Sequence, residues 1–181
     1  MRSVCVFCGS RPGARPEYLE LAAALGRALA ARSLDLVYGG ASVGLMGHMA
    51  DAALAAGGRV IGVIPRSLVD RELAHGRLSE LLVVDTLHER KALMAARADA
   101  FVALPGGVGT LDELFEVITW RVLALHGKPI GLLDPGHYFA PLEALLDHMV
   151  AEGFLEAQHR QLVTRAASAG ELLERWQGGR P

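Results

Sequence analysis

The sequence predicts an α/β fold in which a Rossmann-like, doubly wound parallel sheet is flanked by helices on both faces. Continuous apolar runs alternate along the chain with longer amphipathic segments, and such runs are typical of strands buried on both faces of a parallel sheet. The chain has no internal repeat, low-complexity segment or clear linker. We therefore expect a single domain over residues 1–181, which ends in a helix and polar tail at 170–181.

In the first half of the chain, three apolar runs are expected as strands and two amphipathic segments as helices. A loop that begins Gly9-Ser10 follows the first strand. The pair Gly57-Gly58 stops the second helix, and Pro65 closes the third strand. In chain order these elements are strand 4–8, helix 16–32, strand 34–38, helix 44–56 and strand 60–64.

In the second half, a polar stretch at 66–79 is expected as a loop with one helical turn. The helix after it is opened by a capping box, in which Thr86 precedes Glu89 by three residues. The same alternation of strand and helix then continues to the end of the chain. These elements are strand 81–85, helix 86–98, strand 101–104, helix 111–125, strand 129–133, helix 141–152 and a terminal helix at 170–176.

Length, composition and charge are typical of a globular chain that binds neither nucleic acid nor membrane. The 181 residues can bury a full core, and 51% of them are apolar. The net charge of −2 offers no basic surplus for nucleic acid, and no apolar run approaches the roughly 20 residues that span a bilayer. The N-terminal Met1-Arg2-Ser3-Val4 enters a strand-like run without the apolar segment of a signal peptide. We expect a cytoplasmic protein.

The cysteine and histidine patterns predict neither a disulfide nor a metal site. Cys5 and Cys8 form a C-x-x-C pattern inside a strand-like run, where residues three apart point to opposite faces of the sheet. We interpret both as small, buried apolar residues. The seven histidines show no H-x-x-x-H or similar cluster, so we expect no metal and no cofactor.

The segment 105–113, Pro-Gly-Gly-Val-Gly-Thr-Leu-Asp-Glu, carries the strongest functional signal. It joins a predicted buried strand to a long amphipathic helix. Glycines there let backbone N–H groups approach a phosphate, and a helix N-terminus favours an anion. Thr110 adds a hydroxyl, and carboxylates at Asp112 and Glu113 suit chemistry on an attached sugar. A purely structural interpretation stays open, because Thr110 and Glu113 also fit a capping box.

The carboxyl ends of the predicted strands bring further glycine turns to the same edge of the sheet, where ligands of open α/β sheets bind. Such turns lie at Gly9-Ser10, at Gly39-Gly40 and from Gly106 onward. Each alone is also explained as a tight turn. Three together indicate several backbone segments that approach one polar ligand.

A charged segment opens the helix that follows the fourth strand. Arg90 and Lys91 occupy a helix start, where cations are locally unfavourable, so local stability does not explain them. Arg90 shares a helix face with Met94, and a guanidinium suits bidentate contact with a carboxylate, a phosphate or a sugar diol. Lys91 has the alternative of a solvated surface charge. Glu116, on the next helix, is either part of the site or a structural partner for an arginine.

Three motifs taken together resemble the LOG (Lonely Guy) family of cytokinin riboside 5′-monophosphate phosphoribohydrolases, many of which were long mislabelled lysine decarboxylases. The motifs are PGGVGTLDE at 105–113, LHERKALM at 87–94 and VYGGASVGLMG at 37–47. The resemblance runs from about Val4 to Phe154. This chain departs from the family at Ala41, where a third glycine is usual, and at Leu87, where Met is usual. Both changes bear on base preference and loop fit more than on the reaction.

The resemblance implies roles for individual residues. Arg90 and Glu113 correspond to the catalytic pair of the family, and the glycines and threonine of the 105–113 turn would hold a 5′-phosphate. Members form homodimers or larger assemblies with the site near the subunit interface, so a homo-oligomer, most simply a dimer, is implied here. Besides the pair, the expected substrate-binding residues are Gly9, Ser10, Gly40, Lys91, Met94, Gly106, Gly107, Val108, Gly109, Thr110 and Glu116.

The implied reaction is hydrolysis of the N-glycosidic bond of nucleoside 5′-monophosphates, such as AMP or N6-isopentenyladenosine monophosphate, to free base and ribose 5-phosphate. Glu113 would hold the ribose hydroxyls and stabilise an oxocarbenium-like transition state, while Arg90 would fix Glu113 and the substrate. Two alternatives stay open. One is a nucleotide or molybdenum-cofactor carrier without hydrolysis, and the other is a broad-specificity purine or pyrimidine nucleotide nucleosidase.

Overall fold

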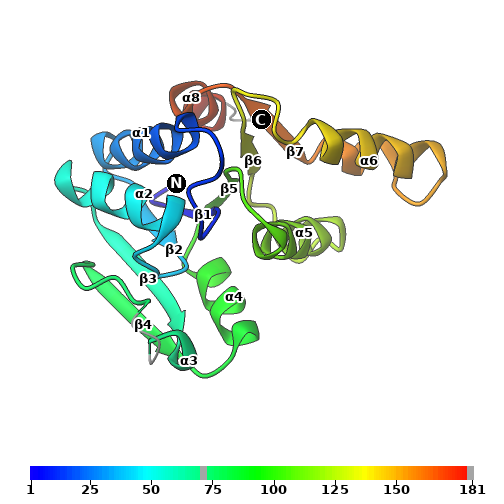
Figure 1. Cartoon of the computed structure of the whole chain (residues 1–181). Coiled ribbons are helices and arrows are strands. Elements are labelled where there is room, and N and C mark those ends of the chain that lie inside the picture. Colours follow the sequence, from blue (N-terminus) through cyan, green and yellow to red (C-terminus); the bar gives the residue numbers. More distant parts are fainter. Residues whose placement is uncertain (70–72, 179–181) are drawn as a thin grey trace.

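The computed structural model describes residues 1–69 and 73–178, in which seven strands form one parallel sheet (Figure 1). The strand order is β4-β3-β2-β1-β5-β6-β7, and each pair of neighbours is parallel. The chain starts at the centre and winds outward in both directions, which confirms the predicted doubly wound fold. The strands are β1 (Ser3–Phe7), β2 (Asp35–Tyr38), β3 (Val60–Pro65), β4 (Glu80–Val84), β5 (Ala100–Ala103), β6 (Ile130–Leu133) and β7 (Val163–Ala166).

Helices cover both faces of this sheet. They are α1 (Glu17–Ala31), α2 (Gly44–Ala55), α3 (Arg66–Val69), α4 (Leu87–Ala96), α5 (Val108–Val122), α6 (Ala140–Ala151), α7 (Ala157–Arg160) and α8 (Ala169–Gly178). One buried apolar cluster joins the sheet to α1, α2 and α8, and a second joins its opposite face to α4 and α5. None of the described helices is long and apolar enough to cross a membrane.

Strand β1 and the residue that follows it supply both clusters. Cys5 belongs to the cluster under α4 and α5, whereas Cys8 belongs to the cluster under α1 and α2. Both thiols are free and buried. This confirms that the two cysteines are small buried residues on opposite faces of the sheet.

Strand β7 and the short helix α7 are missing from the sequence prediction. The β7 sequence, Val-Thr-Arg-Ala, is no apolar run, and only its last residue is fully buried. It joins the sheet through backbone pairing with β6, for example Ile130 with Val163. As an edge strand it faces solvent on one side, so its composition does not carry the pattern of a buried strand.

Helix α5 begins at Val108, three residues earlier than predicted. Gly107 is its N-cap, with extended backbone and no side-chain capping hydrogen bond. Thr110 therefore lies inside the first turn, and the predicted capping box of Thr110 and Glu113 is wrong. Glycine has low helix propensity in a helix interior, but at a helix start its cost is small because the first N–H groups have no intrahelical partner anyway. The other predicted capping box, Thr86 with Glu89, is confirmed.

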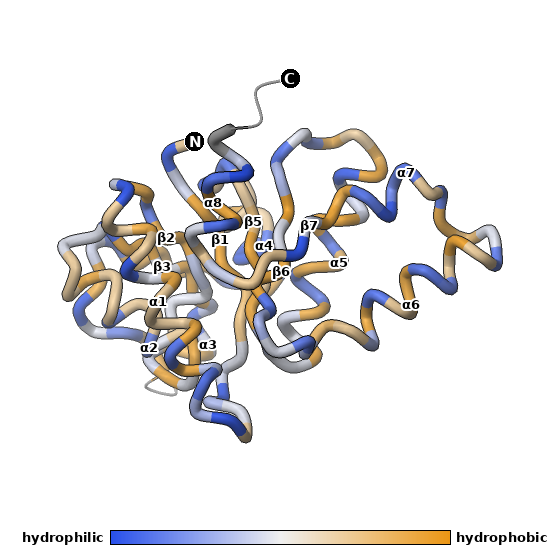
Figure 2. Tube along the Cα trace, turned by 90° about the horizontal axis from the view of Figure 1, so that it is seen from above, coloured by the Kyte–Doolittle hydropathy of each residue, from blue (hydrophilic) through white to orange (hydrophobic). Residues whose placement is uncertain are grey.

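The stretch 66–79 contains the expected helical turn as α3, although residues 70–72 lie outside the described residues. Residues 73–75 run beside the loop after β2, where Ala74 and Ala41 form an antiparallel bridge. The polar tail at 179–181 also lies outside the described part of the chain. Figure 2 shows apolar residues concentrated in the central strands, whereas α6 and α7 reach away from the sheet.

Candidate active site

A cavity of about 720 Å³ lies at the carboxyl ends of the central strands. Its walls come from the loops after β1, β2 and β5 and from the starts of α2, α4 and α5. Strands β1 and β5 are neighbours in the sheet, and the winding direction reverses between them. The cavity therefore occupies the topological switch point, where open parallel sheets bind their ligands.

The loops after β1 and β5 are joined directly beneath the cavity. The Gly9 N–H donates to the carbonyl of Pro105 at 3.1 Å. A Cβ atom on Gly106 would come within 2.0 Å of the Thr110 hydroxyl oxygen and 2.9 Å of the Gly9 nitrogen. Only glycine fits at position 106, because the Thr110 side chain and the Gly9 backbone lie too close for any Cβ atom. The predicted meeting of glycine turns at one edge is confirmed for Gly9, Gly39 and Gly106, which all line the cavity.

The N-terminus of α5 faces the cavity with unused hydrogen-bond donors. Gly107, Val108, Gly109 and Thr110 all line it, and within the described residues their backbone N–H groups donate to no protein acceptor. Four free donors and the positive end of a 15-residue helix are suited to bind an anion. Thr110 is 4% exposed, so its hydroxyl is held against Gly106 at the floor of this site.

Arg90 and Glu113 form a buried ion pair at the wall of the cavity. The Arg90 Nη2 atom lies 3.4 Å from Glu113 Oε1, and the two side chains are 14% and 11% exposed. The Arg90 Nε–H donates to the carbonyl of Val63 on β3 at 3.2 Å, and its guanidinium lies so close to Gly39 that a Cβ there would clash. Arg90 is thus fixed by β2, β3 and Glu113 together, and the predicted contact of the pair is confirmed.

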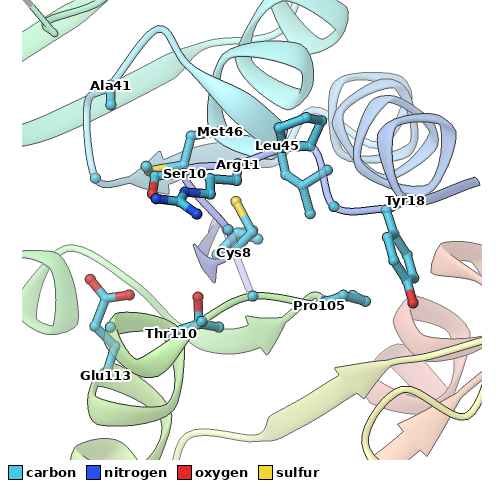
Figure 3. Close-up of a pocket in the computed structure, with 18 of the residues that line it drawn as sticks. Cys8, Ser10, Arg11, Tyr18, Ala41, Leu45, Met46, Pro105, Thr110 and Glu113 are labelled. Carbon is cyan, nitrogen blue, oxygen red and sulfur yellow. The ribbon is translucent and has the colours of Figure 1, made fainter. Parts of the chain in front are cut away.

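The carboxyl group of Glu113 has an unusual environment. Burial raises its pKa from 4.5 to about 7, and the neighbouring Arg90 opposes this rise. Figure 3 shows Glu113 and Thr110 on the same helix, with Cys8 across the cavity from them and Tyr18 at the far end. A carboxyl group that titrates near neutral pH, beside an anion site, is a candidate for acid–base or charge-stabilising chemistry.

Lys91 and Glu116 lie behind the cavity wall rather than in it. The Lys91 Nζ atom lies 3.0 Å from Asp112 Oδ2 and 3.2 Å from Glu116 Oε1, and the lysine side chain is 12% exposed. Burial alone would lower the pKa of Lys91, but its hydrogen bonds to both carboxylates raise it overall. Lys91 is therefore not a solvated surface charge, and Glu116 has a lysine rather than an arginine as its partner. This triad ties α4 to α5 next to the Arg90–Glu113 pair.

Two other expected binding residues also lie outside the cavity wall. Met94 is 1% exposed and belongs to the apolar cluster under α4 and α5, because one helical turn beyond Arg90 the same face turns onto the sheet. Gly40 has a φ of +75°, and a Cβ there would press on Ile64. The left-handed backbone of Gly40 shapes the turn after β2, whereas its neighbours Gly39 and Ala41 line the cavity. Gly9 and Ser10 line the cavity as expected.

Several lining residues were not found from the sequence. Met46 lies within the motif at 37–47 but was not singled out there, and the others come from loops and helix starts outside the three motifs. These residues are Cys8, Arg11, Tyr18, Met46, Leu68 and Tyr138. Tyr138 follows β6, so its position at the carboxyl edge of the sheet is the one signal that would have pointed to it. Burial raises the pKa of the Cys8 thiol well above its usual range, so this group stays protonated and is a poor nucleophile. No set of three or more His, Cys, Asp or Glu side chains among the described residues is arranged to hold a metal ion.

The fold and the cavity define an α/β protein that sets an anion site beside a buried arginine–glutamate pair at the switch point of a parallel sheet. The family model described as "Possible lysine decarboxylase" matches residues 46–176. The chain is 53% identical over 163 residues to the cytokinin riboside 5′-monophosphate phosphoribohydrolase of Rhodococcoides fascians, which covers 90% of this chain and 82% of that relative. The chain belongs to the LOG family, as the sequence motifs indicated.

Two further comparisons agree with this placement. A relative from Oryza sativa subsp. japonica, named "Probable cytokinin riboside 5'-monophosphate phosphoribohydrolase", is 51% identical over 174 residues, which are 96% of this chain and 77% of the relative. The solved structure of a molybdenum cofactor binding protein from Rippkaea orientalis has a TM-score of 0.74 and 22% identity, and the match covers 98% of this chain and 96% of that one. At this identity the likeness shows the common fold.

Proposed function

We propose that the protein hydrolyses the N-glycosidic bond of nucleoside 5′-monophosphates and releases a free base and ribose 5-phosphate. The buried Arg90–Glu113 pair beside the anion site carries this proposal. The names of relatives at about 50% identity support it, since they are cytokinin riboside 5′-monophosphate phosphoribohydrolases. AMP and N6-prenylated adenosine monophosphates are the substrates we propose.

The proposed binding mode follows from the geometry of α5. The 5′-phosphate would accept hydrogen bonds from the free N–H groups of residues 107–110. Glu113 lies one helical turn beyond Thr110, roughly 4.5 Å along the axis, which is the reach of a ribose ring from its phosphate. Binding of the phosphate would thus orient the sugar against the carboxylate, and this remote binding energy would be used for catalysis.

The proposed chemistry uses the ionised form of Glu113. The bond between C1′ and the base nitrogen breaks, its electron pair leaves with the base, and that nitrogen takes up a proton. Water adds to C1′ and loses a proton, so atoms and charge balance. Ionised Glu113 would stabilise the positive charge that develops on the sugar and orient the water, while Arg90 would keep the carboxylate ionised and aligned.

The description of the family model suggests lysine decarboxylation as a second activity, and the cavity does not favour it. Its lining residues, as far as the structure describes them, include no lysine that could hold pyridoxal phosphate. The sequence contains two lysines. Lys91 is paired with Asp112 and Glu116, and the Lys128 ammonium donates to the carbonyl of Ala95.

We also propose that the protein is a homodimer. Leu123 and Leu125, just after α5, are 62% and 69% exposed, and Phe154, after α6, is 87% exposed. Helix α6 reaches away from the sheet (Figures 1 and 2) and buries Leu146 alone. Exposed apolar groups of this kind mark association surfaces. Light scattering should give about twice the chain mass of 19.2 kDa, and a monomer at micromolar concentration would contradict the proposal.

A cytoplasmic location is the last part of the proposal. Cys5 and Cys8 are both free thiols, which suits a reducing compartment. Cell fractionation with an antibody against the native protein would test it, and recovery outside the cytoplasmic fraction would contradict it.

The test of the reaction is release of free base from AMP and from N6-isopentenyladenosine monophosphate, measured beside the unphosphorylated nucleosides. We expect release from the monophosphates and a rate lower by at least about two orders of magnitude from the nucleosides, because the phosphate orients the sugar. Tight binding of the monophosphates without base release would contradict hydrolysis and favour a carrier.

A further inference from the structure

Tyr138, in the loop between β6 and α6, contacts the anion site from outside the family motifs. Its hydroxyl donates a hydrogen bond of 2.5 Å to the carbonyl of Gly106, and its side chain lines the cavity. Gly106 is 32 residues away in sequence and belongs to the glycine loop that leads into α5. A tyrosine from a different strand–helix connection thus reaches the backbone of the proposed phosphate site.

The loop that carries Tyr138 is itself firmly held. Asp134, at the end of β6, is 3% exposed and accepts hydrogen bonds from the backbone N–H groups of Tyr138 at 2.7 Å and Phe139 at 2.9 Å. Phe139 is 2% exposed and packs in the core. The ring of Tyr18 meets the Tyr138 ring edge-on, with centroids 5.9 Å apart. The buried Phe139, the Asp134 carboxylate and the Tyr18 ring therefore fix the direction of the Tyr138 side chain.

The bond to Gly106 controls a group that would bind the ligand. In a trans peptide the carbonyl and the following N–H point in opposite directions, so holding the Gly106 carbonyl also orients the Gly107 N–H. That N–H is the first of the free donors at the start of α5. On the other side, the hydrogen bond from Gly9 to Pro105 holds the preceding peptide. The glycine loop is thus clamped from β1 on one side and from the β6–α6 loop on the other.

We propose that Tyr138 is a positioning residue that holds the glycine loop in its anion-binding conformation. It acts through the backbone of Gly106 and Gly107, because its hydroxyl is bound to the Gly106 carbonyl. The kinetic part of this proposal rests on the proposed phosphoribohydrolase activity. The binding part does not, since it concerns affinity for any phosphate in the loop.

The substitution Tyr138→Phe removes the hydroxyl and keeps the ring contacts with Tyr18 and Phe139. We expect KM for AMP to rise about five- to tenfold, in line with the loss of one hydrogen bond, while kcat changes by less than about twofold because Arg90 and Glu113 are untouched. Calorimetry should show the same five- to tenfold weakening for ribose 5-phosphate and for inorganic phosphate, whereas affinity for free adenine should not change.

A matched control removes another hydroxyl from the protein. The Thr119 hydroxyl, on the exposed side of α5, donates to the carbonyl of Phe115 and lies outside the cavity wall. Thr119→Val should leave phosphate affinity and KM at the wild-type values. The melting temperatures of both variants, measured alongside, should stay within a few degrees of wild type.

Three results would overturn the proposal. Unchanged phosphate affinity in Tyr138→Phe would show that the hydroxyl does not position the loop. An equal loss of affinity for adenine would indicate general damage to the cavity, and a fall in kcat with KM unchanged would indicate a role in the chemical step. If the wild-type protein releases no base from monophosphates, the calorimetric comparison with inorganic phosphate still decides whether Tyr138 holds the anion site.

Discussion

The guanidinium of Arg90 lies 3.4 Å from the carboxylate of Glu113, although the two residues stand on helices that follow different strands. Helix α4 leaves the edge strand β4, whereas α5 leaves the central strand β5. Arg90 spans this distance because the carbonyl of Val63 and the absence of a side chain at Gly39 give its guanidinium a fixed path to the cavity. The pair therefore depends on the sheet geometry as much as on either helix.

Removal of the arginine should raise the pKa of Glu113 further. Arg90 lowers that pKa against the effect of burial, so Arg90→Ala leaves the carboxyl group buried without its cation. We expect kcat/KM at pH 7 to fall by about two orders of magnitude or more, with partial recovery at higher pH as Glu113 ionises. A pH–rate profile of the variant checks this, and a profile with an unshifted midpoint would contradict it.

The wild-type enzyme should show a matching pH dependence. If the ionised form of Glu113 is the active one, kcat/KM should rise about tenfold per pH unit below the pKa of about 7 and level off above it. The phosphate of AMP also ionises in this pH range, so the profiles must be corrected for it. Inhibition by ribose 5-phosphate, measured at each pH, serves as the control because it carries the same phosphate group. A rate that rises as the pH falls below 7 would assign the protonated form to catalysis instead.

The same carboxyl group should make stability depend on pH. Its pKa is about 7 when folded and about 4.3 when unfolded, so the folded state binds the extra proton between these values. Its ionisation therefore lowers the free energy of unfolding as pH rises from about 4.3 to 7, by up to roughly 4 kcal/mol. Glu113→Gln should remove this slope and be more stable than wild type at pH 8. Urea unfolding of both proteins at pH 5 and pH 8 measures these differences. The same change in the free energy of unfolding between the two pH values in both proteins would contradict the prediction.

The close contact at Gly106 should not tolerate a methyl group. A Cβ there would meet the Thr110 hydroxyl at 2.0 Å and the Gly9 nitrogen at 2.9 Å, so Gly106→Ala must distort the loop and should lower both stability and affinity for phosphate. Gly109→Ala is the matched control for stability, because a Cβ at Gly109 has no neighbour within 4 Å. Thermal melts should show a clear loss of stability for Gly106→Ala and a melting temperature at or slightly above the wild-type value for Gly109→Ala.

Much of the fold is visible in the sequence because the central strands are buried on both faces. Their continuous apolar runs, such as Phe101–Leu104, leave few alternatives to a parallel sheet. Strand β7 lies at the edge and pairs through its backbone, so no apolar pattern marks it. The early start of α5 was missed because Gly107 and Gly109 look unfavourable for a helix, yet at the N-terminus their free N–H groups are what a bound anion uses.

The parts of the site that lie within a sequence motif could be predicted. The parts that depend on how helices and loops pack against one another could not. The glycine turn and the Arg90–Glu113 pair lie within motifs, and the structure brings both to one cavity. The pairing of Lys91 with Asp112 and Glu116 depends on how α4 packs beside α5, which no local pattern encodes. Tyr138 contacts Gly106 through a backbone carbonyl, and such a contact leaves no trace in the sequence of either partner.

The measurement to make first compares Glu113→Gln with wild type in two assays on the same substrate. Glutamine keeps the shape of the side chain and removes its charge, so the phosphate site at 107–110 should be intact. We expect AMP to bind the variant within about threefold of wild type by calorimetry, while base release falls by about three orders of magnitude or more. Turnover close to the wild-type rate would show that the Glu113 carboxylate does not carry the reaction.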